Sequence, residues 1–224
     1  MTATIKLGLK ITLKFFVNRK EIFLMAVNLQ KGQKVNLTKS NGKKLTKLMV
    51  GLGWDAAEPE GGGFLKKLFS GKKDIDCDAS VFVCKGGKLT DKDDVVYFNN
   101  LKHKSGAVQH MGDNLTGEGE GDDEQIFVDL DRLPADYDKL VFVVNIYQAV
   151  QRKQHFGMIK NAFIRIVDNE TGEELIHYNL SDNYDNMLAM VAGEVYKRGN
   201  DWKFNAVGNG TTDPGLGELS KRFM

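Results

Sequence analysis

The segment with the clearest chemical potential is an acidic, glycine-rich stretch at residues 112–124, which reads GDNLTGEGEGDDE. It contains six carboxylates and no basic side chain. Because like charges packed this closely repel one another in a folded loop, the segment should be either fully solvated or neutralised by a cation. Both alternatives are compatible with charge density alone.

The spacing of glycine residues favours the cation. Gly117, Gly119 and Gly121 allow the backbone to curl and turn its carbonyl oxygens inward. Carbonyl and carboxylate oxygens are the ligands of Ca²⁺, which takes about six to eight of them. Zinc would require His or Cys, which this segment lacks, and Mg²⁺ demands a stricter octahedron, so it is the second choice.

The segment does not fit an EF-hand, although Asp113 to Glu124 spans the right length. Leu115 and Gly117 stand where that loop carries oxygen ligands, and Glu118 stands where it requires glycine.

A second acidic group lies upstream, at Asp74, Asp76 and Asp78. On an extended chain these three side chains point the same way. Three carboxylates on one face are not buried without partners, so we expect them to cap the same metal site from another segment.

The elements around these segments are expected to be strands. Short apolar runs, separated by turn residues, recur about every 10–15 residues, and no long helical period is present. The expected strands are 35–37, 45–52, 79–84, 95–98, 126–130, 140–147, 162–167, 175–180, 188–196 and 202–207. This pattern predicts an all-β fold, an antiparallel β-sandwich with a few short helices.

The chain is expected to divide into three parts. Residues 25–210 form the sandwich domain, with an inserted loop at 56–73, and residues 211–224 form a C-terminal tail. Residues 1–24 form an N-terminal extension in which positions 5–15 alternate strictly between apolar and other residues. That extension is read either as an extra edge strand or as a segment outside the native protein, with translation starting at Met25.

Composition excludes several classes. A net charge of +1 argues against a general nucleic-acid binder. Cys77 and Cys84 are seven residues apart, so on one strand they would face opposite sides and form no disulfide, as in a reducing compartment. Arg165, between apolar neighbours, is expected to be an outward-facing ion-pair partner. The four histidines lack metal-binding spacing and are expected to be structural or to lie at the surface: His103, His110, His155 and His177.

Five motifs in order resemble the TerD family of tellurium-resistance and stress proteins. They are VGLGWD at 50–55, DCDAS at 76–80, FNNL at 98–101, the acidic segment at 112–124, and NAFIRI at 161–166. The resemblance covers residues 25 to about 210 and implies a cytoplasmic β-sandwich that binds calcium. Acidic or amide positions of the family motifs match Asp76, Asp78, Asp113, Asn114, Glu118, Glu120, Asp122, Asp123 and Glu124. Asp55, Asn99 and Asn100 also match, either as ligands or as turn formers.

Together these observations predict a non-enzymatic, calcium-binding stress protein associated with tellurite resistance. An alternative is a Ca²⁺-dependent scaffold that docks other stress proteins at a membrane transporter, peripheral to the inner face of the membrane. A third is a hydrolase that uses paired carboxylates as acid and base, although no sequence feature places two of them in a pocket. No nucleic-acid partner is expected.

Overall fold

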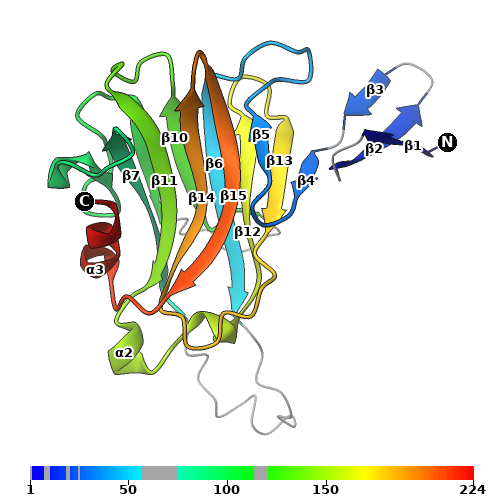
Figure 1. The fold of residues 1–224 in the computed structure, drawn as a ribbon. Helices are drawn as coiled ribbons and strands as arrows, with labels where there is room; N and C mark the ends of the chain where they lie inside the picture. The colour runs from blue at the N-terminus through cyan, green and yellow to red at the C-terminus, as the bar shows by residue number, and fades with distance from the viewer. Residues whose placement is uncertain (1, 8–10, 19–20, 25, 57–74, 114–120) are drawn as a thin grey trace, which may run out of the picture.

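The fold is described from a computed structural model, which describes residues 2–7, 11–18, 21–24, 26–56, 75–113 and 121–224. Two six-stranded sheets face each other (Figure 1). All strand pairs within them are antiparallel except one parallel pair, so the predicted antiparallel sandwich is confirmed.

The two sheets are named sheet I and sheet II. In sheet I the strand order is β4 (Val27–Leu29), β13 (Glu174–Asn179), β12 (Ile159–Asp168), β6 (Lys47–Ala56), β10 (Glu124–Asp129) and β9 (Val108–Asp113). In sheet II it is β5 (Lys34–Asn36), β15 (Asp201–Thr211), β14 (Ala189–Arg198), β11 (Tyr137–Ile146), β7 (Cys77–Lys85) and β8 (Val95–Val96). Each predicted run overlaps one of these strands, whereas β4 and β9 were not predicted.

The main core lies between the sheets and follows strand alternation. On β11, Leu140, Phe142 and Val144 are buried in this core, and on β6 Leu48 and Val50 face them from the other sheet. Apolar side chains from both inner faces therefore fill the sandwich, as in other aligned sheet pairs.

The outer face of sheet II has a smaller core of its own. Val141 and Val143 of β11 pack there with Phe82 of β7 and with Leu219. The covering elements are the helix α3 (Leu216–Ser220) and the short 3-10 turn η3 (Lys221–Phe223) (Figure 1). The central strand of sheet II is thus buried on both faces, which explains its unbroken apolar sequence.

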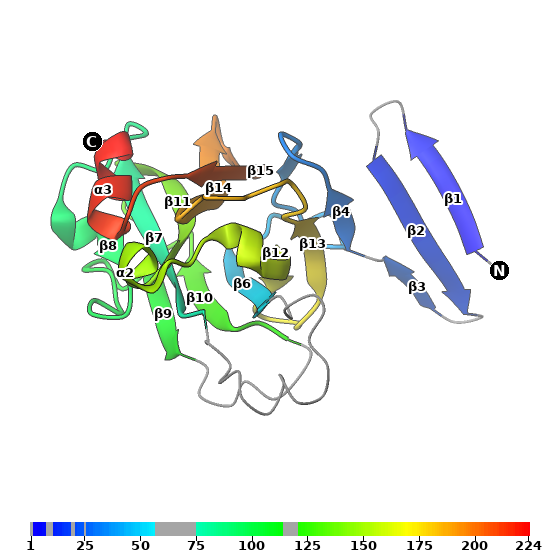
Figure 2. The same ribbon diagram turned by 90° about the horizontal axis from the view of Figure 1, so that it is seen from below.

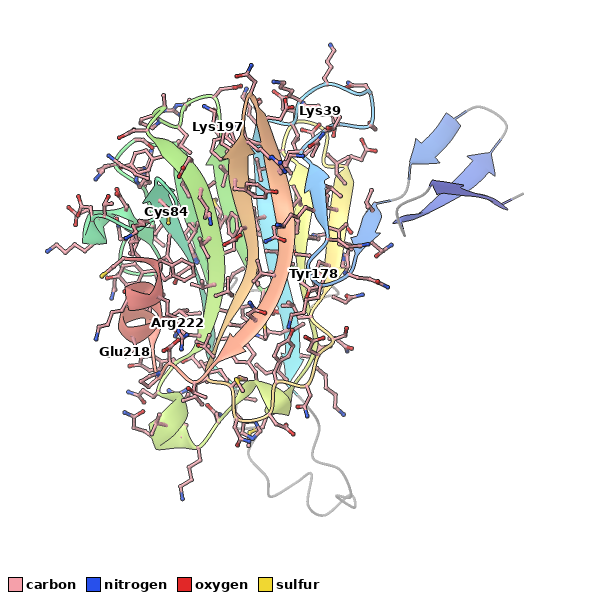
Figure 3. All side chains as sticks on the ribbon, in the orientation of Figure 1. Lys39, Cys84, Tyr178, Lys197, Glu218 and Arg222 are labelled. Carbon is pink, nitrogen blue, oxygen red and sulfur yellow. The ribbon has the colours of Figure 1, made fainter. Side chains whose placement is uncertain are left out.

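The two cysteines lie on opposite faces of β7, as predicted. Cys77 belongs to the main core and Cys84 to the smaller core beneath the C-terminal helix, and both are free thiols. Figure 3 labels Cys84 on β7 and Glu218 on the covering segment. Burial raises the pKa of the Cys84 thiol to about 12.

The N-terminal extension forms a separate three-stranded sheet, to one side of the sandwich (Figures 1 and 2). Its strands are β1 (Thr2–Leu7), β2 (Ile11–Asn18) and β3 (Glu21–Leu24). Strand structure is confirmed for residues 5–7 and 11–15, and residues 8–10 lie outside the described residues, but the expectation of one edge strand was wrong. The alternation runs through two antiparallel strands that pair with each other.

The remaining described elements are a short helix and two 3-10 turns, α2 (Ala149–Arg152), η1 (Lys92–Asp94) and η2 (Phe156–Met158). Among the described residues, no helix combines the length and the apolar character needed to cross a membrane. Except for Ala56, which ends β6, the expected insertion at 56–73 lies outside the described residues.

Candidate metal centre

The acidic segment connects two neighbouring strands of sheet I. Strand β9 ends at Asp113 and β10 begins at Glu124, so the expected loop at 112–124 is shorter than predicted, with both ends in strands. Asn114, Glu118 and Glu120 lie outside the described residues, and only the backbone of Asp113 is described. The structure therefore places the C-terminal half of the motif, from Gly121 onward.

Asp122 lies on the outer face of sheet I, in a buried ion pair. Its two carboxylate oxygens accept hydrogen bonds from Nε and Nη2 of Arg165, at 2.7 and 2.9 Å. Gln125 donates a third hydrogen bond to it, at 3.1 Å. Arg165 also donates to Glu174, at 2.9 Å. The expectation that Arg165 is an outward-facing ion-pair partner is confirmed, and the pair fixes Asp122 against the sheet.

A glycine on the central strand makes room for this carboxylate. Gly51 on β6 lies between the core residues Val50 and Leu52, so its own Cβ would point to the outer face. A Cβ there would collide with the carboxylate of Asp122. Asp122 can therefore approach the strand only because this residue has no side chain.

Asp123, the residue before the first residue of β10, also pairs with β6. Its amide donates to the carbonyl of Leu52 at 2.9 Å, and its carboxylate accepts from the amide of Trp54 at 2.7 Å. Partial burial raises the pKa of Asp123, the Trp54 amide opposes that rise, and the negative charges of Asp55 and Asp122 add to it. A half-buried carboxylate held beside two others is an environment that a cation would stabilise.

Glu124 points into the sandwich and ties the acidic segment to sheet II. Its Oε2 atom accepts a hydrogen bond from the amide of Ala79, on β7, at 2.6 Å. The same oxygen is 3.2 Å from Nε2 of His110, and the Gly112 amide donates to Nδ1 of that ring at 2.9 Å. Since Nδ1 accepts, Nε2 carries the proton and donates, which fixes the histidine tautomer.

Asp76 and Asp78 face away from this arrangement. Cys77 and Ala79 point into the main core, so the alternation of β7 places Asp78 on the outer face of sheet II. Asp76 is exposed, and its carboxylate lies 3.5 Å from Nη1 of Arg152. The two acidic segments do meet, through Glu124 and the backbone of Ala79, but the carboxylates of Asp78 and Asp122 belong to outer faces of different sheets.

The described donors fit calcium in part. Asp55 and Asp123 offer the hard oxygen ligands that Ca²⁺ prefers. Each of these two carboxylates accepts one hydrogen bond, from Asn161 and from the Trp54 amide. Asp122 is paired with Arg165, and Glu124 contacts Ala79 and His110. Within residues 26–55, 75–112 and 121–224, no cluster of three or more His, Cys, Asp or Glu side chains has the geometry of a metal site.

His110, which was expected to be structural or at the surface, is structural: it is buried against Glu124. Its place beside the acidic segment was not predicted. The available signal was alternation, because His110 falls two positions after the buried Val108 on β9. The other histidines have structural partners: His103 contacts Asp94, His155 caps η2, and His177 contacts Glu174.

The chain is an antiparallel β-sandwich protein in which an acidic segment connects two paired strands of sheet I. Comparison with known proteins identifies its family. The model of the TerD domain matches residues 25–223. The chain belongs to the TerD family.

The relatives include stress and tellurium-resistance proteins. The chain is 55% identical over 200 residues to stress response protein SCP2 of Bacillus subtilis, covering 89% of this chain and 100% of the relative. It is 46% identical over 187 residues to general stress protein 16U of the same organism, covering 83% and 91%. Tellurium resistance protein TerD of Serratia marcescens is 41% identical over 187 residues, again covering 83% and 91%.

Two solved structures share the fold. The protein SAV2460, described as of unknown function, superposes with a TM-score of 0.58 at 21% identity, covering 79% of this chain and 95% of the other. SCO6318 from Streptomyces coelicolor A3(2), described as a homologue of telluride resistance protein TerD, superposes with a TM-score of 0.51 at 20% identity, covering 74% and 90%.

Proposed function

We propose that this chain is a calcium-binding stress-response protein of the tellurium-resistance group, and that it acts by binding rather than by catalysis. The observation that carries the proposal is Asp123, a half-buried carboxylate held beside Asp55 and Asp122 at the end of an acidic hairpin loop. A Ca²⁺ ion at this position would neutralise the charge of that loop. Relatives named as stress response and tellurium resistance proteins support the physiological setting.

The three adjacent carboxylates have different roles in this proposal. Asp122 anchors the loop to sheet I through Arg165, and Glu124 anchors it to sheet II through Ala79. Asp123 offers oxygen to the ion, together with Asp55 and with the loop residues expected from the sequence, Asp113, Asn114, Glu118 and Glu120. Because the two anchors are already hydrogen-bonded to protein groups, they do not form a free acid–base pair, which supports binding over hydrolysis.

The two buried free thiols support a reducing, cytoplasmic setting.

Calorimetric titration of the full chain with CaCl₂, after treatment with EDTA, tests the proposal. We expect a saturable heat of binding, and we expect Asp123→Asn to weaken it by about tenfold or more. Asp131→Asn is the control, since it makes the same substitution at an exposed aspartate on another turn.

Thermal unfolding supplies an independent reading. A ligand that binds only the folded state at about 100 times its Kd stabilises that state by about 2.7 kcal/mol. EDTA should therefore lower the melting temperature, and excess Ca²⁺ should restore it. If no heat of binding is measured, and if the melting temperature is the same in EDTA and in excess Ca²⁺, calcium binding is refuted.

A further inference from the structure

A second candidate site lies on the outer face of sheet II, away from Asp122 and Asp123. A cleft of about 360 Å³ opens between β7, β11 and the segment leading into the C-terminal helix. That volume is in the range of pockets for small molecules, about 300–1,000 Å³. Its polar floor and aromatic rim include Asp78, Ser80, Asn145, Tyr97, Phe98 and Tyr147.

The floor of this cleft holds two buried polar atoms without hydrogen-bond partners among the described residues. Ser80 is fully buried and its Oγ atom is unpaired, and Asn145 is 7% exposed with its Oδ1 atom unpaired. Buried polar groups in folded proteins nearly always have a hydrogen-bond partner. Two such atoms without one, in the same cleft, indicate that a bound molecule supplies the missing hydrogen bonds. A ligand with hydrogen-bond donors would supply it.

Strand register brings these atoms together with a negative charge. Asp78 on β7 is the direct cross-strand partner of Asn145 on β11, and Ser80 lies two residues further along the same face of β7. Cross-strand neighbours have their Cβ atoms about 4.5–5.5 Å apart. The floor thus offers a carboxylate, an amide oxygen and a hydroxyl within one small area.

The chemistry of this floor selects a cation rich in donors. An alkylammonium group has three N–H donors and no acceptor, which matches the three oxygens of the floor. The rim suits the same ligand, because Phe98 and Tyr147 are large, exposed aromatic residues and aromatic faces attract cations. The ring of Tyr147 already has one cation near it, the guanidinium of Arg152 at 5.1 Å from its centroid.

We propose that this cleft binds the primary ammonium group of a small amine, with Asp78, Ser80 and Asn145 as its oxygen partners and the aromatic rim around its alkyl chain. This goes beyond the calcium proposal, and it assigns Asp78 to an organic cation on sheet II.

The first test is titration of the full ¹⁵N-labelled chain with 1,4-diaminobutane, followed by NMR. We expect saturable shifts at the amides of Asp78, Ser80 and Asn145, with 1,4-butanediol as the uncharged control of the same length producing none. Nα-acetyl-lysine N-methylamide distinguishes a free amine from a lysine side chain as the natural source, and binding of either supports the site.

Two variants and a control test the roles of the residues on the floor of the cleft. Asp78→Asn removes the charge and should weaken diamine binding about tenfold or more, whereas Asn145→Asp adds a charge and should strengthen it. Because one variant should weaken diamine binding and the other should strengthen it, a loss of stability in one variant does not explain both results. Asp131→Asn is the matched control and should leave the diamine affinity unchanged.

Calcium provides the remaining comparison. Asp123→Asn should weaken calcium binding and leave diamine binding unchanged, so the two proposals fail separately. Three results would overturn the amine site: no saturable shift up to about 10 mM diamine, equal shifts with the diol, or calcium displacing the diamine while moving the same three amides.

Discussion

At the scale of single residues, three consecutive acids occupy three different environments. Asp122 is paired with Arg165 on one outer face, Asp123 lies at the end of the hairpin, and Glu124 is buried between the sheets. Each position along an extended chain turns the side chain to the other side, so neighbours in sequence have different partners. The outer face of sheet I continues this network from Arg165 to Glu174 and His177.

The pair of His177 and Glu174 predicts a pH dependence. Nδ1 of His177 is 2.9 Å from Oε1 of Glu174, and this contact, ahead of opposing burial, raises the pKa of the imidazole above its ordinary 6.5. The same contact lowers the pKa of Glu174 below 4.5. The histidine therefore stabilises the fold fully below 6.5 and loses this contribution as pH rises through its raised pKa. The glutamate contributes above 4.5 and loses it as pH falls through its lowered pKa.

NMR titration of the His177 ring measures this directly. We expect a midpoint above 6.5 in the native chain and a lower midpoint in Glu174→Gln. Glu173→Gln is the control, because the neighbouring Glu173 accepts a hydrogen bond from Ser40 instead, and it should leave the midpoint in place. An unchanged midpoint in Glu174→Gln would refute the assignment.

At the scale of elements, strand β6 organises the candidate centre. It lies between β12 and β10 in the middle of sheet I, with Leu48, Val50 and Leu52 facing the core. On its outer face, Gly51 and Gly53 have no side chains, and the side chains of Asp122 and Phe163 occupy the space. Glycine weakens a strand, and here it permits the close approach that the ion pair needs.

Replacing these glycines tests that interpretation. A Cβ at Gly51 would meet the Asp122 carboxylate, and one at Gly53 would meet the ring of Phe163. We expect Gly51→Ala and Gly53→Ala each to lower the free energy of unfolding by about 1–3 kcal/mol, because the neighbours are packed and must shift. Urea unfolding measures the change. Gly217→Ala is the control, since nothing lies within 4 Å of its Cβ position, and a loss equal to that of Gly51→Ala would contradict the prediction.

At the scale of the whole molecule, the C-terminal segment acts as a cover for sheet II. Leu219 is fully buried against Phe82 and Val141, and the amide of Leu89 donates to the carbonyl of Phe223 at 2.6 Å. Figure 3 shows Glu218 and Arg222 on this segment, beside the strands that it covers. Residues expected to form a tail thus complete the second core.

Removing the anchor of this cover should destabilise the whole domain. We expect Leu219→Ala to cost about 2–5 kcal/mol, the range for truncating a buried leucine. Met224→Ala is the control, because Met224 is 61% exposed. Thermal unfolding measures both, and reactivity of Cys84 with a thiol reagent reports whether the cover has opened. Equal stability of the two variants would show that the segment does not support the sheet.

Much of the fold followed from the sequence, because strand alternation is a local property. The runs at 79–84 and 162–167 identified their strands, and the spacing of Cys77 and Cys84 placed them on opposite faces. Strand β9 was missed, since Gln109 and His110 interrupt its apolar pattern. Alternation from Val108 places His110 on the buried face, but its partner Glu124 lies on the neighbouring strand, and no local pattern indicates such a partner.

The sequence by itself determined that the chain is a β-sandwich with a concentrated acidic segment. Charge density and apolar alternation are both properties of consecutive residues. Only the tertiary structure decided how those carboxylates are used. Asp122 meets Arg165 across 43 positions of the chain, and Glu124 meets Ala79 across 45, through strand register and the stacking of two sheets. Such contacts depend on long-range pairing, and they separate the anchors of the loop from the oxygens proposed to hold an ion.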